Sequence, residues 1–112
     1  MMVPMTDEKL QFMYVMRPTD PTKAASRDGW TDYDRETFEL NLAHLHCAKG
    51  AGKLILAGRT LDSDGSGPAI VVFEADTEGE AQRFFKAEPF LTRGFCTTTL
   101  HPFSNPVMRD SE

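Results

Sequence analysis

Apolar and polar positions along the chain predict four strands and two helices. Runs of apolar, aromatic and β-branched residues predict strands at 10–17, 53–61, 69–75 and 95–103. Capping residues and helix stops predict helices over 31–49 and 78–86. The resulting order, β-α-β-β-α-β, is typical of a ferredoxin-like α+β fold, in which two helices cover one face of a four-stranded antiparallel sheet.

Turn and capping residues set the first boundaries. Pro18 ends the first strand, and the polar segment 18–29, with its prolines and glycine, predicts a long loop. Thr31 and Asp34 have the spacing of a capping box, so the first helix begins there. The glycine at position 50 stops this helix.

The second half of the chain carries similar signals. The sequence DSDGSGP at 62–68 predicts a hairpin loop between two strands. Thr77 caps the second helix, and Phe84 and Phe85 lie on its expected buried side. The sequence EPF at 88–90 ends this helix and leaves a short turn before the last strand.

The strands lack the alternation of a sheet that has one wet face. FMYVM, LILA and IVVF are apolar at nearly every position. A sheet with helices on one face and water on the other alternates apolar and polar residues. Both faces must therefore be covered, and we expect a homodimer in which the sheets of two copies face each other.

Length and charge narrow the function. The 112 residues predict a single domain over 1–112, with a core at about 10–103 and loosely held tails. A net charge of −5 argues against nucleic acid as a partner. No apolar run approaches the roughly 20 residues of a membrane span, and no signal peptide is recognisable. These features predict a cytoplasmic protein whose Cys47 and Cys96 are reduced and buried.

The sequence predicts neither a metal ion nor a cofactor. His44 and His46 point about 200° apart on a helix, and the pair His44 and Cys47 lacks further ligands. The acidic loop at 62–67 lacks the glutamate that completes a calcium loop, because Phe73 stands in its place.

Four segments resemble the YCII-related family. MYVMRP at 13–18 is similar to its opening strand, and GKLILAGRTL at 52–61, IVVFEAD at 70–76 and AEPF at 87–90 follow in the family's order. The resemblance covers about residues 10–103. It implies a ferredoxin-like, dimeric α/β barrel type of fold with a cleft at the sheet edge. It also implies a histidine from the first helix paired with an aspartate of an Asp-Pro step.

Both members of that pair are altered in this chain. With no gap, Asn41 takes the histidine position, while Ala43 and Leu45 match the family string. A shift of three residues would put His44 there instead and lose both matches. Glu88 replaces the aspartate of the Asp-Pro step. Asparagine cannot exchange a proton near neutral pH, so the ungapped alignment weakens acid–base chemistry.

Two functions remain open at this point. In the first, the chain is a weak or degenerate lyase- or isomerase-like enzyme for a compact aromatic molecule, with Glu88 and His44 catalytic and Asn41, Arg59 and Thr60 binding the substrate. In the second, the dimer is a non-catalytic binding or regulatory module. We expect one polar cleft built from Asn41, His44, Arg59 and Glu88, in which Asn41 lies nearer to Glu88 than His44 does. Arg59 should face this cleft or pair with a carboxylate, for which Glu88 is the candidate.

Overall fold

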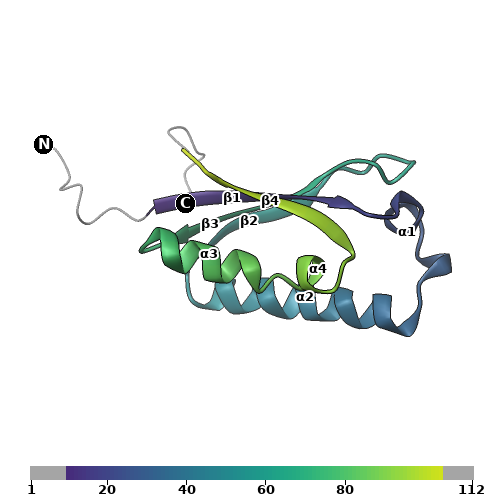
Figure 1. Cartoon of the computed structure of the whole chain (residues 1–112), viewed down its shortest axis with the longest axis horizontal. Helices are drawn as coiled ribbons and strands as arrows, with labels where there is room; N and C mark the ends of the chain where they lie inside the picture. Colours follow the sequence, from purple (N-terminus) through teal and green to yellow (C-terminus); the bar gives the residue numbers. More distant parts are fainter. Residues whose placement is uncertain (1–9, 105–112) are drawn as a thin grey trace, which may run out of the picture.

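The computed structural model describes residues 10–104 (Figure 1). The strands are β1 (Leu10–Pro18), β2 (Leu54–Arg59), β3 (Ala69–Ala75) and β4 (Cys96–Pro102). The helices are α1 (Pro21–Ala25), α2 (Asp32–Gly50), α3 (Glu78–Lys86) and α4 (Pro89–Thr92), with a 3-10 helix, η2, at Arg27–Gly29. The tails expected to be loosely held fall almost wholly outside these described residues.

The four strands form one antiparallel sheet in the order β2-β3-β1-β4. Helices α2, α3 and α4 lie on the same side of this sheet (Figure 1). The ferredoxin-like α+β fold predicted from the sequence is therefore confirmed. The strands and long helices begin and end within two residues of their predicted bounds.

The segment 18–29 departs from the expected loop because it holds α1 and η2. The Asp20 side chain accepts from the backbone N–H of Thr22, and Pro21 stands in the first turn of α1. Ser26 caps η2 in the same way. Short polar helices that owe their start to a single cap show little apolar periodicity, so composition alone suggested a loop.

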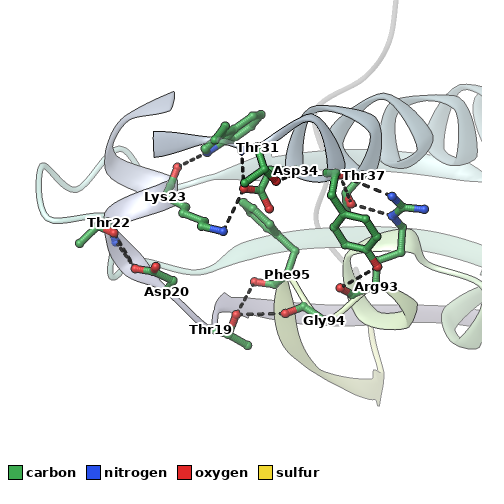
Figure 2. Close-up of polar contacts among 12 residues, drawn as sticks. Thr19, Asp20, Thr22, Lys23, Thr31, Asp34, Thr37, Arg93, Gly94 and Phe95 are labelled. Atoms are coloured by element: carbon green, nitrogen blue, oxygen red, sulfur yellow. Dashed lines mark hydrogen bonds and ion pairs between the residues drawn. The ribbon is translucent and has the colours of Figure 1, made fainter. Parts of the chain in front are cut away.

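The N-terminus of α2 is fixed by the predicted capping box. The Thr31 hydroxyl accepts from the backbone N–H of Asp34, and the Asp34 carboxylate accepts from the backbone N–H of Thr31. Lys23 of α1 adds an ion pair of 2.9 Å to this buried carboxylate (Figure 2). The Thr31 and Lys23 contacts hold the pKa of Asp34 below its usual value. Because of these contacts, α1 is anchored to the start of α2.

A second polar contact ties α2 to the turn before β4. Arg93 Nε donates to the buried Thr37 hydroxyl at 2.7 Å, and its guanidinium lies over the Tyr33 ring (Figure 2). The same guanidinium pairs with Glu36 at 2.8 Å. This contact fixes the distance between α2 and the end of the sheet at which β4 begins.

The core lies between the sheet and the helices. On the helix-facing side, Phe12 is opposite Phe73 and Tyr14 is opposite Val71, and all four are buried. Phe84 and Phe85 of α3 pack against this cluster, as their predicted position on the buried side requires. Cys96 is buried as expected, whereas Cys47 is exposed on α2, so its predicted burial is wrong.

The opposite face of the sheet carries apolar side chains at its centre. Met13 is paired with Val72 and Val15 with Ile70, and strand alternation points these side chains away from the helices. No helix or strand within residues 10–104 covers this face (Figure 1). We call these four residues and Leu56 the open face. Its composition explains why the strands read as apolar on both sides.

The β2–β3 hairpin folds back onto α1. Gly65, at φ +72°, is buried there, and a Cβ at this position would overlap the Pro21 carbonyl oxygen and the backbone N of Ala25. Only glycine combines this backbone conformation with so close an approach. The hairpin and α1 therefore meet at one end of the sheet, and together they bound the space described below.

Within residues 10–104, none of the helices combines the length and the hydropathy that crossing a membrane requires.

Candidate functional site

The carboxyl group of Glu88 is fully buried, with 0% of the residue exposed. Tyr14 of β1 donates its hydroxyl to Oε1 at 2.5 Å, and Asn41 of α2 donates Nδ2 to Oε2 at 2.8 Å. The backbone N–H of Phe90 donates to Oε2 at 2.9 Å, so Glu88 also caps α4. We call Tyr14, Asn41 and Glu88 the Glu88 cluster.

The burial of this cluster changes the acidity of its neighbours. Removal from water raises the pKa of the Tyr14 hydroxyl far above its ordinary value of 10.0, and the charge and hydrogen bond of Glu88 raise it further. Burial, with a smaller contribution from Glu88, also raises the pKa of the Cys96 thiol to about 12. At neutral pH Tyr14 is thus a donor, and Cys96 is an unreactive thiol.

The Glu88 cluster is suited to holding the fold together. Both carboxyl oxygens already accept hydrogen bonds, and none of the three side chains lines either of the two cavities described below. A general acid or base must reach a substrate atom within about 3 Å. In this arrangement Glu88 joins β1, α2 and α4, and it lies outside the lining of both of these cavities.

A cavity of about 240 Å³ lies beside the cluster, at the end of the sheet near α1. Four aromatic rings line it together with two arginines, and we call it the aromatic cavity. Phe90 and Cys96 belong both to its wall and to the surroundings of Glu88. Its main lining side chains are those of Met16, Arg27, Trp30, Phe38, Arg59, Thr60, Ala69, Phe90, Phe95 and Cys96.

A second cavity, of about 420 Å³, lies between α2, α3 and β3, and we call it the α2–α3 cavity. His44 lines it, with its ring stacked on Phe84 at 4.3 Å and its Nε2 3.1 Å from the Phe84 carbonyl oxygen. A carbonyl oxygen only accepts, so Nε2 is the donor in this contact. His44 therefore belongs to a different space from Arg59.

The single polar cleft expected from the sequence does not form, so that expectation is wrong. Asn41 and Glu88 come together, and Asn41 is nearer to Glu88 than His44 is, as the ungapped alignment predicts. Arg59 and Thr60 line the aromatic cavity, and His44 lines the α2–α3 cavity. Asn41 and His44 are three residues apart on α2 but make different contacts. Asn41 points toward Glu88, and His44 packs on Phe84 of α3.

Glu88 is not the partner of Arg59, so that candidate for the ion pair is wrong, whereas Arg59 does line a cavity. Glu88 is saturated by uncharged donors, whereas Arg59 is exposed at the end of β2. The Thr60 hydroxyl donates to Asp62 at 2.8 Å. Arg59 and Glu88 do not meet, because Arg59 lines the aromatic cavity and Glu88 lies outside its lining, behind Phe90.

Several residues of the site were missed in the sequence. Tyr14 was counted as one more apolar strand residue, although its hydroxyl requires a partner when buried. Arg27 and Trp30 fell in or beside the segment assigned to a loop, where Arg27 lies 5.0 Å above the Trp30 ring. A lone tryptophan three residues after an arginine was the available signal.

Among the described residues, no group of three or more His, Cys, Asp or Glu side chains is placed to hold a metal ion.

A family model places the chain among known sequences. The model of the YCII-related domain matches residues 12–104. The chain belongs to this family. No curated protein matches the sequence of this YCII-related domain.

Two solved structures resemble the domain. One is 5-chloro-2-hydroxyhydroquinone dehydrochlorinase from Burkholderia phenoliruptrix, in complex with 2,5-dihydroxybenzoquinone. Its sequence is 20% identical to this chain, and the TM-score is 0.57. The match covers 83% of this chain and 93% of the dehydrochlorinase. The other is a dimeric ferredoxin-like protein from an uncultured marine organism, which is 16% identical and has a TM-score of 0.39. This match covers 94% of this chain and 96% of that protein. The similarity to the dehydrochlorinase supports the fold assignment and nothing beyond it.

The raised pKa of Tyr14 predicts a loss of stability at alkaline pH. The folded protein keeps the Tyr14 proton above pH 10, whereas the unfolded chain releases it, so the free energy of unfolding falls as the pH rises. The loss is about 1.4 kcal/mol per pH unit for one proton. Tyr14→Phe removes this contribution, and at neutral pH it lowers stability by about 1–3 kcal/mol because Glu88 loses a donor. Urea denaturation from neutral pH to pH 11 measures both effects.

The matched control for this prediction is Tyr33→Phe, which alters the chain's other tyrosine, a residue 54% exposed. This variant should retain the alkaline slope of the wild type. Parallel loss of stability in Tyr14→Phe and wild type above pH 10 would contradict the role given to the Glu88 cluster.

Proposed function

We propose that this YCII-related domain binds a compact organic molecule in the aromatic cavity without acid–base turnover by a histidine–carboxylate pair. One observation carries the proposal: the partner of the buried Glu88 carboxylate is the Asn41 amide. An amide cannot take or give a proton near neutral pH. The cavity next to the cluster keeps aromatic walls and polar groups that a ligand can use.

The size and lining of the aromatic cavity support this function. About 240 Å³ suits a molecule with a single ring better than a large cofactor. Phe90 and Phe95 stack at 5.0 Å, and Trp30 meets Phe95 edge-on at 5.7 Å. The dehydrochlorinase of similar fold is in complex with a single-ring quinone. We extend to this domain only the class of ligand, a compact ring with polar substituents.

In this proposal Glu88 and His44 have no catalytic role. Glu88 supports the cavity wall through Phe90 and α4, and Asn41 and Tyr14 hold it in place. His44 belongs to the packing of α2 against α3. Arg59 and Thr60 remain binding residues, because both line the cavity. The cytoplasmic location expected from the sequence stays a prediction.

Narrowing the aromatic cavity should abolish ligand binding. In Ala69→Leu the added carbons occupy space at the start of β3, where Ala69 lines the cavity. A panel of single-ring phenols, benzamides and benzoates is screened by thermal unfolding. At about ten times its Kd, a ligand should raise the Tm of the wild type by about 5 °C. The same compound should leave the Tm of Ala69→Leu unchanged.

Two controls accompany the cavity experiment. Ala51→Leu makes the same change in the α2–α3 cavity and should keep the ligand-induced shift. His44→Ala should change the affinity less than about threefold, since His44 lies outside the aromatic cavity. The proposed function fails if no compound stabilises the wild type, or if Ala69→Leu is stabilised equally.

We further propose that the domain functions as a homodimer joined through the open face. On this face Met13, Val15 and Ile70 are partly exposed and Leu56 is 48% exposed, and no helix or strand of residues 10–104 covers them. Monomeric proteins seldom expose a contiguous apolar patch of this kind. A second copy of the sheet buries it symmetrically.

Light scattering at micromolar concentration should give the mass of two chains. Val15→Lys places a charge at the centre of the open face and should give the mass of one chain. Leu42→Lys is the control, since Leu42 is 40% exposed on α2, on the other side of the sheet. This control should remain dimeric. A wild type with the mass of one chain would end the dimer proposal.

Asn41→His should create the proton-exchanging pair that this chain lacks. The new imidazole would lie next to the Glu88 carboxylate, which favours its charged form and raises its pKa above the ordinary value of about 6.5. NMR titration of the histidine signals measures that pKa. In Asn41→His combined with Glu88→Gln the shift should vanish. Equal titration in the two variants would show that position 41 does not face Glu88 in solution.

A further inference from the structure

The charged side chains that line the aromatic cavity are all cations. Arg27 and Arg59 line it, and no aspartate or glutamate does, in a chain whose net charge is −5. The α2–α3 cavity differs, because Lys53 and Arg83 share its lining with Glu74 and Glu80. The excess of positive charge is therefore specific to the aromatic cavity.

Neither arginine is neutralised by a neighbour. Among residues 10–104, no carboxylate lies within ion-pairing distance of Arg27 or Arg59. Asp62, on the adjoining hairpin, accepts from the Thr60 hydroxyl and does not line the cavity. Two guanidinium groups at the mouth of one small cavity attract an anion, and each can donate two hydrogen bonds to it.

The two arginines differ in their freedom to bind. The Arg27 guanidinium lies 5.0 Å above the Trp30 ring and 4.5 Å above the Phe38 ring, so it is held against the wall. Both arginines are exposed, but among residues 10–104 no aromatic ring lies against the Arg59 guanidinium. It stands opposite Ala69 at the end of β2, with the cavity beside it. Arg59 is consequently the better placed of the two to meet a ligand.

We propose that the ligand of the aromatic cavity is a single-ring aromatic anion, whose charged oxygens are bound by Arg59 and whose ring packs among Trp30, Phe38 and Phe90. This inference rests on the proposed function and adds the charge and the orientation of the ligand. Arg27 raises the local positive potential and fixes the wall on which the ring packs. A neutral ring would leave the Arg59 charge without a partner.

Calorimetric titration of the full chain with three compounds tests this inference. Benzoate combines the ring with the charge, benzamide keeps the ring without the charge, and acetate keeps the charge without the ring. Benzoate should bind, benzamide should bind at least about tenfold more weakly, and acetate should not bind measurably. Trp30 is the chain's one tryptophan and lines the cavity, so its fluorescence should change with benzoate.

Substitution of Arg59 tests whether its guanidinium binds the carboxylate of benzoate. Arg59→Gln should weaken benzoate binding about tenfold and leave benzamide binding unchanged, whereas Arg59→Lys should restore part of the loss. The control is Arg83→Gln, the same change at the α2–α3 cavity, which should bind benzoate as the wild type does.

Each contrary result has a separate meaning. Equal binding of benzoate and benzamide, or unchanged benzoate binding by Arg59→Gln, overturns the inference and leaves the proposed function standing. Equal binding of benzoate and acetate overturns the part that concerns the ring. If neither aromatic compound binds, the inference is overturned, and the cavity experiment with the wider panel and Ala69→Leu decides the proposed function by itself.

Discussion

The buried carboxylate of Glu88 connects the parts of this fold that would otherwise touch only through apolar contacts. Tyr14 brings β1 to it, Asn41 brings α2, and the N–H of Phe90 brings the first turn of α4. A carboxylate without partners in such a place would cost several kcal/mol. The three donors remove that cost only when sheet and helices stand at one spacing, so the cluster fixes the geometry of the layer.

The aromatic cavity depends on that spacing. Phe90 lies two residues after Glu88 and stacks on Phe95, which in turn meets Trp30. At the other side, the β2–β3 hairpin reaches α1 through Gly65, where no side chain fits. The cavity is thus a consequence of two close approaches, one made by a buried acid and one by a glycine. Gly65 itself lines the cavity, whereas Glu88 does not.

The buried Glu88 cluster and the two arginines that line the aromatic cavity are separate groups in this domain. Burial is the main cause of the raised pKa values of Tyr14 and Cys96. Perturbed groups often mark catalytic sites, but structural networks perturb them too. The groups that face the cavity, Arg27 and Arg59, are charged and accessible. In the proposed function, the ligand therefore contacts the arginines and aromatic rings of the cavity, while the buried Glu88 carboxylate keeps the wall in place.

The sequence by itself determined the order of the elements, the sheet and the covering helices, because caps, turns and runs of apolar residues are local signals. Thr31 with Asp34, and Thr77 before α3, are read within a few residues of the ends that they set. The alignment also predicted that Asn41 is nearer to Glu88 than His44 is. The caps and turns require knowledge of neighbours along the chain only, whereas the contact between Asn41 and Glu88, 47 positions apart, was predicted from the family resemblance.

The tertiary structure alone decided which side chains share a space. Asn41 and His44 are three residues apart, yet one contacts Glu88 and the other stacks on Phe84 across a separate cavity. Arg59 and Glu88 have opposite charges but lie on different sides of an aromatic wall. Contacts between residues distant in sequence depend on how layers pack, and a difference of less than one helical turn is enough to change them.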